Sequence, residues 1–393
     1  MSKLALDGGK PVRTKAFPGW PIWDETEKKS LMETLESGQW GLYNSKISEF
    51  EKKYADFVGV NHCILVTSGT TALVISLIAG GIGEGDEVII PPYTFTATAA
   101  AVLMMNAVPV FVDVDPGTYN MAPEEFEKAI TERTKAVIPV HIAGGPADMD
   151  AIMAVAKKHD IFVIEDACQA HAAEWKDQKV GGIGNMGCFS FQASKNLCAG
   201  EGGAITTNDP ELADRAWAYH NCGRSQDASR YETYGLGANF RMTAWQAAIL
   251  LSQMTRLEEQ TKTRNENGVY LSEKLAEIEG ITPARRDEAI TCHAYHLYMF
   301  QYDSSKFNNK PREKFLEALS AEGIPCSRGY HPLYKHDMFR KPIGGIDYSK
   351  INLPVTEKAC NEEAVWLKQS TLLGTKEDMD DIITAVKKIK DNF

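Results

Sequence analysis

The first half of the chain alternates short, continuously apolar runs with amphipathic segments. The apolar runs predict buried strands at Cys63–Val66, Glu87–Ile90, Val108–Val114, Ala136–Ile142 and Ile161–Ile164. Helical patterns fall between several of these runs, at Thr71–Ala79, Pro123–Ile130 and Met149–His159. Strands that are apolar throughout and separated by helices are typical of a largely parallel sheet with helices on both faces. The pattern therefore predicts an α/β fold.

The segments before this alternating region are less regular. Residues 1–23 show no helical period and predict an irregular arm. Asp24, followed three residues later by Glu27, is typical of a capping box, so we expect a helix to begin there and to stop at Gly38. A second helix is expected from the shared face of Ile47 and Tyr54.

The pattern changes after about residue 240. The apolar runs Gly187–Phe191 and Gly203–Thr207 predict a hairpin-like pair, and Thr243 to about Lys274 predicts one long helix. Shorter strands and helices follow, including Arg312–Glu322. We therefore expect a large domain over residues 1–250 and a smaller α+β domain over residues 251–393.

Composition narrows the possible partners. The chain has 393 residues and a formal net charge of −11, and an acidic surface disfavours binding to nucleic acid. No apolar run approaches the roughly 20 residues needed to span a bilayer, and the N-terminus lacks a signal-peptide pattern. We expect a cytoplasmic protein without membrane contact. The eight cysteines are scattered without a C-x-x-C motif, which favours reduced thiols and no metal site.

Ligands of open parallel sheets bind beyond the carboxyl ends of the strands, so the residues that follow each strand are candidates for the site. Gly69 permits a tight turn, and Thr70 and Thr71 place hydroxyl and N–H groups at a helix N-terminus that suits a phosphate. An ordinary helix cap explains the same residues. Phe95, after the next strand, is either a core aromatic or a platform for a flat ring.

Two later segments carry acid–base chemistry. Asp166 ends an apolar strand, where a carboxylate is costly unless it is paired, for example with a protonated pyridine nitrogen; a helix N-cap is the alternative. Gln169 can donate a hydrogen bond to a phenolic oxygen. Lys195 follows an aromatic strand, and a partly desolvated lysine there is suited to Schiff-base chemistry. Ser190 lies five residues before it, within reach of a phosphate.

Candidates in the last part of the chain are less specific. Asn239 and Arg241 stand in a glycine-rich turn before the long helix, and an ordinary structural turn explains them equally well. Arg241, Tyr330 and His331 are candidates for substrate contact, although His331 is also explained as a surface loop residue.

Taken in order, these segments resemble the DegT-type aminotransferases, which depend on pyridoxal 5′-phosphate (PLP). The resemblance runs over essentially the whole chain, from Leu4–Arg13 to Leu372–Gly374. The segments Glu165-Asp-Ala-Cys-Gln-Ala-His171 and Ser190-Phe-Gln-Ala-Ser-Lys-Asn196 carry it most specifically.

The resemblance implies a fold type I, aspartate aminotransferase-like arrangement and a role for each candidate. It implies that Lys195 forms the imine link to PLP, Asp166 pairs with the pyridine nitrogen and Gln169 contacts the ring oxygen. Phe95 would then stack on the ring, while Thr70, Thr71 and Ser190 hold the phosphate. It also implies a homodimer with shared active sites, in which Asn239 reaches the phosphate of the neighbouring subunit.

Within the family, two features resemble one subgroup. Gly8–Arg13 and Gly200–Gly203 also occur in glutamine:scyllo-inosose aminotransferases and in 3-amino-5-hydroxybenzoate synthases. Gln192-Ala-Ser194 replaces the Tyr-Pro-Thr of many sugar-nucleotide members. We therefore expect transfer from glutamine or glutamate to a keto-cyclitol or keto-sugar, as in aminocyclitol or aminoglycoside-type biosynthesis.

Three alternatives remain open at this point. A nucleotide-sugar aminotransferase would have the same site with a different acceptor. A related PLP-dependent dehydratase is disfavoured because those enzymes carry His at the position of Lys195. A binding or regulatory protein that keeps the fold without turnover is disfavoured by the intact set of Lys195, Asp166 and Gln169.

Overall fold

A mixed seven-stranded sheet forms the centre of the larger part of the molecule. The computed structural model describes residues 3–225, 233 and 235–393. The sheet has the order β1-β9-β8-β5-β4-β2-β3. The strands are β1 (His62–Val66), β2 (Glu87–Ile90), β3 (Val108–Phe111), β4 (Thr134–Val137), β5 (Phe162–Asp166), β8 (Met186–Ser190) and β9 (Gly203–Thr207). Only β9 runs against the others, since it pairs antiparallel with both β1 and β8. The predicted α/β class with a largely parallel sheet is confirmed.

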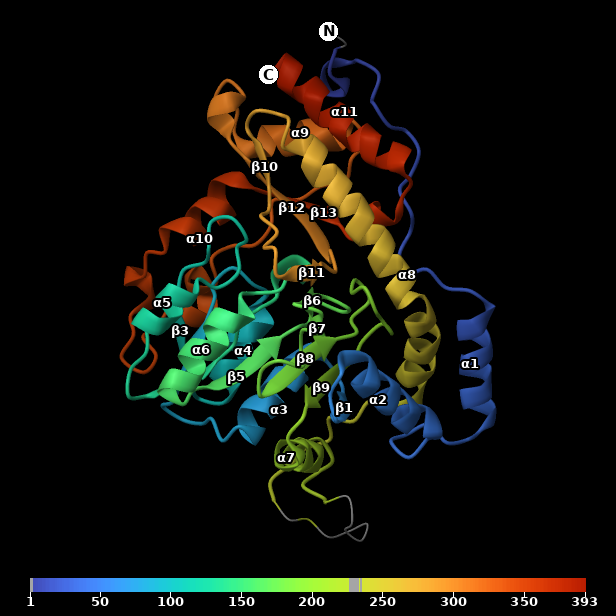
Figure 1. Ribbon diagram of the computed structural model, residues 1–393, viewed down its shortest axis with the longest axis vertical. Helices are drawn as coiled ribbons and strands as arrows, with labels where there is room; N and C mark the ends of the chain where they lie inside the picture. The colour runs from blue at the N-terminus through green and yellow to red at the C-terminus, as the bar shows by residue number, and fades with distance from the viewer. Residues whose placement is uncertain (1–2, 226–232, 234) are drawn as a thin grey trace.

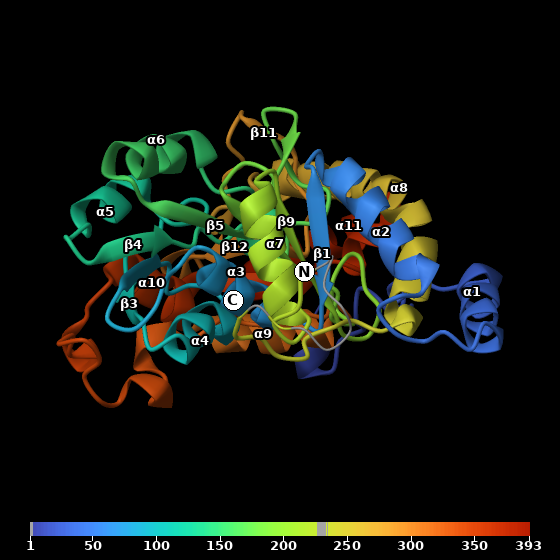
Figure 2. The ribbon, with the colours of Figure 1, turned by 90° about the horizontal axis from the view of Figure 1, so that it is seen from below.

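Helices cover both faces of this sheet (Figure 2). One face carries α2 (Ser45–Val58), α5 (Pro123–Lys128), α6 (Met149–His159) and part of α8 (Ala244–Leu275); the other carries α3 (Gly69–Ala79), α4 (Thr96–Met104) and α7 (Pro210–His220). Consecutive residues of β5 show the alternation, because Val163 belongs to the core cluster of the first face and Ile164 to that of the second. Both side chains are fully buried, as the continuously apolar pattern predicts.

Two of the predicted strands end earlier than expected. β3 stops at Phe111 rather than Val114, and β4 stops at Val137 rather than Ile142. After β4 the chain still bonds to its neighbours, since Ile138 N donates to Ile89 O and Val140 forms a single parallel bridge with Asp166. It then turns through a 3₁₀ segment in which Ala143 has a φ of 56°. The apolar residues of this segment are still buried, which explains why periodicity alone predicted a longer strand.

The helix boundaries follow the capping signals. Asp24 accepts a hydrogen bond from Thr26 N, and Glu27 completes the predicted capping box of α1 (Glu25–Glu36). The predicted long helix from Thr243 to about Lys274 is α8, which begins one residue later, at Ala244, with Thr243 in its N-cap position. Figure 1 shows α8 running from the large sheet to the other end of the molecule.

Two smaller sheets and several short helices complete the fold. One sheet joins β10 (Ile281–Pro283), β12 (Leu297–Tyr302) and β13 (Ala364–Lys368); the other joins β11 (Ile290–Cys292), β6 (Glu174–Trp175) and β7 (Gln178–Lys179). The remaining α-helices are α9 (Arg312–Ala321), α10 (Pro354–Lys358) and α11 (Lys376–Asn392). Single 3₁₀ turns lie at Ala5–Asp7, Ile142–Gly144, Ser304–Lys306, Leu333–Lys335, Asp337–Phe339, Tyr348–Lys350 and Thr371–Leu373, and a π-helical turn lies at Ala359–Glu363.

The two ends of the chain meet on the C-terminal part (Figure 1). Leu4 belongs to the core cluster formed by α9, α11 and the β10-β12-β13 sheet. The buried carboxylate of Glu322 accepts hydrogen bonds from the backbone N–H groups of Ala5 and Val12 and pairs with Lys388 at 2.8 Å. The N-terminal arm is therefore fixed to the C-terminal part, whereas the domain boundary at residue 250 stays a prediction.

Within the described residues, no helix is both long enough and apolar enough to cross a membrane. The same residues contain no group of three or more His, Cys, Asp or Glu side chains placed to hold a metal ion.

Candidate active site

A cavity of about 490 Å³ lies at the carboxyl edge of the large sheet. Asp166 and Ser190 are the last residues of the adjacent strands β5 and β8, and both line it. The cavity brings together eight of the sequence-predicted residues: Gly69, Thr70, Phe95, Asp166, Gln169, Ser190, Lys195 and Tyr330. This agrees with the rule that ligands of open parallel sheets bind beyond the strand ends.

Lys195 lies in the turn that follows β8. Its backbone N–H donates to the carbonyl of Gln192 at 2.9 Å, which fixes the turn. The side chain is half-buried and makes no hydrogen bond or ion pair with any residue that the structure describes. Burial lowers the pKa of its ammonium group, and the nearby Cys168 and Asp166 act in the opposite direction. A desolvated, unpaired amine is suited to nucleophilic attack on a carbonyl carbon.

Asp166 places a buried carboxylate in the same cavity. Its side chain is 5% exposed. Oδ2 accepts a hydrogen bond from the Thr98 hydroxyl at 2.8 Å, and Oδ1 accepts a longer one from Cys168 N at 3.3 Å. Turns and the short strand β6, not a helix, follow Asp166, so the alternative that it is a helix N-cap is wrong. Thr98 on α4 was missed in the sequence, where it is one of several similar residues in an Ala- and Thr-rich segment.

Gln169 has a fixed side-chain orientation. Its Oε1 accepts from the backbone N–H of Ala143 at 2.9 Å, and its Nε2 donates to the Tyr330 hydroxyl at 2.9 Å. Tyr330 in turn packs edge-on against Trp366, with ring centroids 4.6 Å apart. This bond from the amide to a phenol is made within the protein, whereas the contact of Gln169 with a cofactor ring oxygen stays a prediction.

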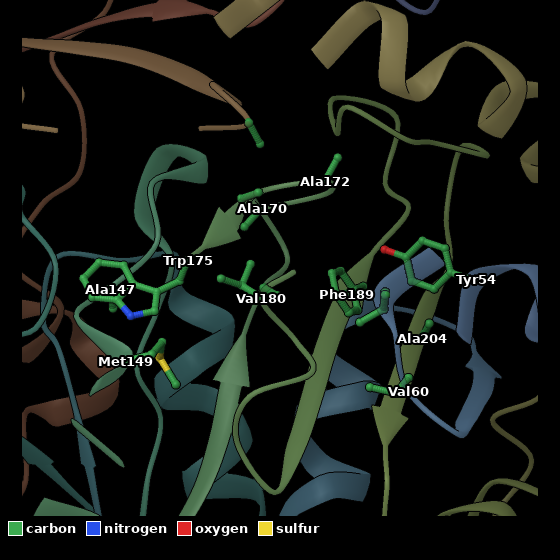
Figure 3. Packing of buried hydrophobic residues seen from close by; sticks show 14 of the residues in the cluster. Tyr54, Val60, Ala147, Met149, Ala170, Ala172, Trp175, Val180, Phe189 and Ala204 are labelled. Carbon is green, nitrogen blue, oxygen red and sulfur yellow. The ribbon is translucent and has the colours of Figure 1, made fainter. Parts of the chain in front are cut away.

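A buried histidine, His171, bonds to the backbone carbonyl of Ser190. The Ser190 carbonyl can only accept, so His171 Nε2 donates to it at 2.8 Å and His171 Nδ1 accepts from the Tyr54 hydroxyl at 2.8 Å. Burial lowers the pKa of His171 to about 4, which keeps the ring neutral. Figure 3 shows Tyr54 beside Phe189, and their rings meet edge to face at 5.2 Å. His171 lies in the Glu165–His171 motif, but the partners of its ring are not predictable from that motif.

The N-terminus of α3 faces the cavity through Ser68, Gly69 and Thr70. Ser68 caps the helix by accepting from Thr71 N at 3.1 Å. The Thr71 hydroxyl bonds to Ser68 and Thr67, and Thr71 does not line the cavity. Gly69 is needed for close packing rather than for a left-handed turn, because a Cβ there would lie 2.7 Å from the Cys168 sulfur.

Phe95 lines the cavity with an exposed side chain. It is 58% exposed and occupies the N-cap position of α4. The alternative of a core aromatic is therefore wrong, and the ring is available to a ligand.

Besides Thr71, three other predicted residues lie outside the cavity in the single chain. Asn239 is exposed. Arg241 donates to Asn221 Oδ1 at 3.0 Å and to the Cys222 sulfur at 3.3 Å. His331 is exposed and bonds to Arg328.

A mostly parallel sheet with a half-buried lysine and a buried aspartate at its carboxyl edge has the architecture of the fold type I transferases. Sequence comparison is more specific, because the profile of the DegT/DnrJ/EryC1/StrS aminotransferase family matches residues 21–387. The chain belongs to this family and is an aminotransferase.

Individual relatives are similar over their full lengths. The chain is 37% identical to the L-glutamine:2-deoxy-scyllo-inosose aminotransferase of Micromonospora echinospora, over 99% of this chain and 98% of that protein. It is 35% identical to the 3-amino-5-hydroxybenzoate synthase of Amycolatopsis mediterranei, over 92% and 94% of the two chains. The crystal structure of a 3-amino-5-hydroxybenzoic acid synthase superposes with a TM-score of 0.90 and 33% identity, over 97% of this chain and all of that one.

Proposed function

We propose that the chain is a PLP-dependent aminotransferase that transfers an amino group from glutamine or glutamate to a keto-cyclitol or keto-sugar. The observation that carries the proposal is the unpaired, half-buried amine of Lys195 in one cavity with the buried carboxylate of Asp166. The names of the full-length relatives, which specify glutamine and an inosose, support the choice of donor and acceptor.

The groups that line the cavity fit PLP. Lys195 would hold the aldehyde carbon, and the Asp166 carboxylate would pair with the pyridine nitrogen. Phe95 would cover the ring, and Gln169 would lie at the ring oxygen. Ser68, Thr70 and Ser190 at the N-terminus of α3 would hold the phosphate, since N–H groups and hydroxyls there favour an anion. Thr71 was also predicted to hold the phosphate, but it would act only indirectly, through its hydrogen bond to Ser68.

PLP supplies an electron sink that stabilises the negative charge left when the donor loses its α-proton. The chain would supply the rest. Asp166, held by Thr98, would present its carboxylate to the pyridine nitrogen. The Lys195 amine would take the proton from the donor carbon and return a proton to the acceptor carbon, because it is an unpaired base in the cavity.

A second cavity of about 760 Å³ would receive the acceptor. It shares Gln192, Ser194, His296 and Leu297 with the Lys195 cavity, so the two adjoin. Its other walls come from the N-terminal arm at residues 15–21, from Gly323, Pro325 and Ser327, and from residues 368–371 at the end of β13. We infer that the keto group enters beside Lys195 while the hydroxyl-bearing ring occupies this second space.

We also infer a homodimer with shared active sites. Asn239 is exposed and lies outside the cavity of its own chain, which suits a residue that serves a neighbouring subunit. Large apolar side chains on and near α1 are exposed as well: Trp23 67%, Met32 47%, Leu35 46%, Trp40 49% and Tyr43 82%. Exposed apolar groups in this number mark an interaction surface.

The function is tested by following the visible cofactor band of the purified, PLP-loaded protein. Glutamine or glutamate should bleach the band, and a keto acceptor added next should restore it. A panel of acceptors should include scyllo-inosose, 2-deoxy-scyllo-inosose and a nucleotide-linked keto-sugar. Restoration by the nucleotide-linked sugar alone would make the chain a nucleotide-sugar aminotransferase, and no bleaching by any amino acid would refute transamination.

A further inference from the structure

Arg264 carries a guanidinium group whose charge is not balanced. The residue lies on α8 and is fully buried. Its Nε donates to Gln369 Oε1 at 2.9 Å. Across the residues that the structure describes, Nη1 and Nη2 have no hydrogen-bond acceptor, and the side chain forms no ion pair. Burial lowers the pKa of Arg264 to about 9, as expected for a cation without an acidic partner.

Two other buried arginines, Arg13 and Arg312, have hydrogen-bond acceptors for their terminal nitrogens. Arg13 Nη1 pairs with Asp378 at 2.7 Å and with Asp381 at 2.8 Å. Arg312 Nη1 donates to backbone carbonyls, among them Cys360 O at 3.0 Å. Arg264 differs because both of its terminal nitrogens lack acceptors. Since burying an unpaired charge is costly, such a group in a folded protein points to a ligand that supplies the missing anion.

The position of Arg264 identifies where that ligand would come from. The ring of Trp20 lies over the guanidinium, 5.2 Å from its carbon atom. Trp20 and Gln369 both form walls of the 760 Å³ cavity that adjoins Lys195. Trp20 is half-buried, and its indole N–H donates to Ala193 O at 3.0 Å in a solvent-exposed position. Arg264 therefore contacts two wall residues of the substrate cavity, Trp20 and Gln369.

We propose that Arg264 is the binding site for the carboxylate of the amino donor, which reaches Nη1 and Nη2 when the ring of Trp20 moves aside. This inference rests on the proposed aminotransferase function. A carboxylate matches the two free nitrogens in a bidentate arrangement and supplies the missing negative charge. A neutral keto-cyclitol has no such group, so the site distinguishes the donor from the acceptor.

The test measures the two half-reactions separately. In an Arg264→Met variant, kcat/KM for bleaching of the cofactor band by glutamine should fall about 10–100-fold, which corresponds to the loss of a charge-assisted hydrogen bond. The aminated form should still react with the keto acceptor at close to the wild-type rate. Glutarate, which has carboxylates but no amine, should raise the Tm of the wild-type protein and not that of the variant.

Two further variants keep the result interpretable. Arg264→Lys retains the charge but not the planar guanidinium, so kcat/KM for glutamine should fall about tenfold. This variant replaces Arg264→Met if the latter does not fold. Arg256→Met is the matched control on the same helix, because its guanidinium is already paired with Asp24 at 3.0 Å; its glutamine dependence should not change. Unchanged glutamine kinetics in both Arg264 variants, or equal losses in the two half-reactions, would overturn the inference. A wild-type protein that no amino acid bleaches would instead refute the proposed function, and the inference with it.

Discussion

Thr98 donates its hydroxyl proton to Asp166 Oδ2 at 2.8 Å, and both side chains are buried. The threonine lies on α4 and the aspartate at the end of β5, 68 residues later in the chain. Thr94 bonds to the Thr98 hydroxyl at 3.1 Å and orients it. The carboxylate is thus held by a helix N-terminal segment as well as by its own strand, and this arrangement fixes the oxygen atoms that would face the cofactor.

The first prediction concerns this pair. Asp166→Asn removes the negative charge that would keep a pyridine nitrogen protonated, so kcat should fall at least about 100-fold, or roughly 2.7 kcal/mol of barrier. Thr98→Val removes only the supporting hydrogen bond and should cost about 1.5–3 kcal/mol, shared between kcat and cofactor affinity. Steady-state kinetics and PLP titration measure both. An Asp166→Asn protein with a near-normal rate and bound PLP would show that the ring is held in another way.

The second prediction concerns Lys195. Borohydride reduction of the PLP-loaded protein should attach the cofactor covalently to the peptide that contains Lys195, because this amine is unpaired and its pKa is lowered by burial. Lys195→Ala should lose transamination. Peptide mass spectrometry gives the attachment site. Attachment to the exposed Lys15, which lies at the edge of the adjoining cavity, would contradict the assignment.

Site residues that lie close to a strand end can be predicted from the sequence, whereas residues that reach the site from distant segments cannot. Asp166 and Ser190 end two adjacent parallel strands, and Gln169 and Lys195 lie within five residues of those strand ends. Their meeting at one sheet edge therefore follows from parallel topology. Thr98 and Tyr54 contact the site from helices far along the chain, and those contacts depend on the order of the strands.

The same reasoning explains errors at the strand ends. Apolar periodicity reports burial, and the residues after β3 and β4 stay buried although regular strand pairing has ended there. The lack of acceptors for the terminal nitrogens of Arg264 cannot be predicted from the sequence either. Arg264 reads as one charged residue of a long amphipathic helix, and its lack of acceptors appears only when every neighbour is placed.

The third prediction concerns pH and stability. Burial raises the pKa of Glu51 on α2 to about 7, while its Oε1 accepts a hydrogen bond from Leu65 N at 3.0 Å. Because the folded-state pKa lies above the unfolded value, the group's stabilisation is fully present below about pH 4.5 and is lost as the pH rises through about 7. Glu51→Gln should therefore raise the free energy of unfolding by about 1–3 kcal/mol at pH 8 and change it little at pH 5.

Urea unfolding at the two pH values measures this difference. Glu49→Gln is the control, since Glu49 lies on the same helix but is exposed and paired with Lys53. An equal effect of Glu51→Gln at pH 5 and pH 8 would mean that the carboxyl does not titrate in this range.

The last prediction concerns the shared site and Asn239. An asparagine amide can donate one hydrogen bond to a phosphate oxygen, so Asn239→Ala should weaken PLP retention by about 1.5–3 kcal/mol without unfolding the chain. Lys195→Ala and Asn239→Ala chains, each impaired alone, should recover activity when they form heterodimers. In the heterodimer, one site would combine Lys195 of the Asn239→Ala chain with Asn239 of the Lys195→Ala chain, so both residues there would be wild type. The other site would carry both substitutions. Activity and retained PLP are measured after mixing, with heterodimers verified by differential tagging. If verified heterodimers gain nothing over the parent proteins, Asn239 acts within its own subunit or outside the site, and the exposed position that it occupies in the single chain needs another explanation.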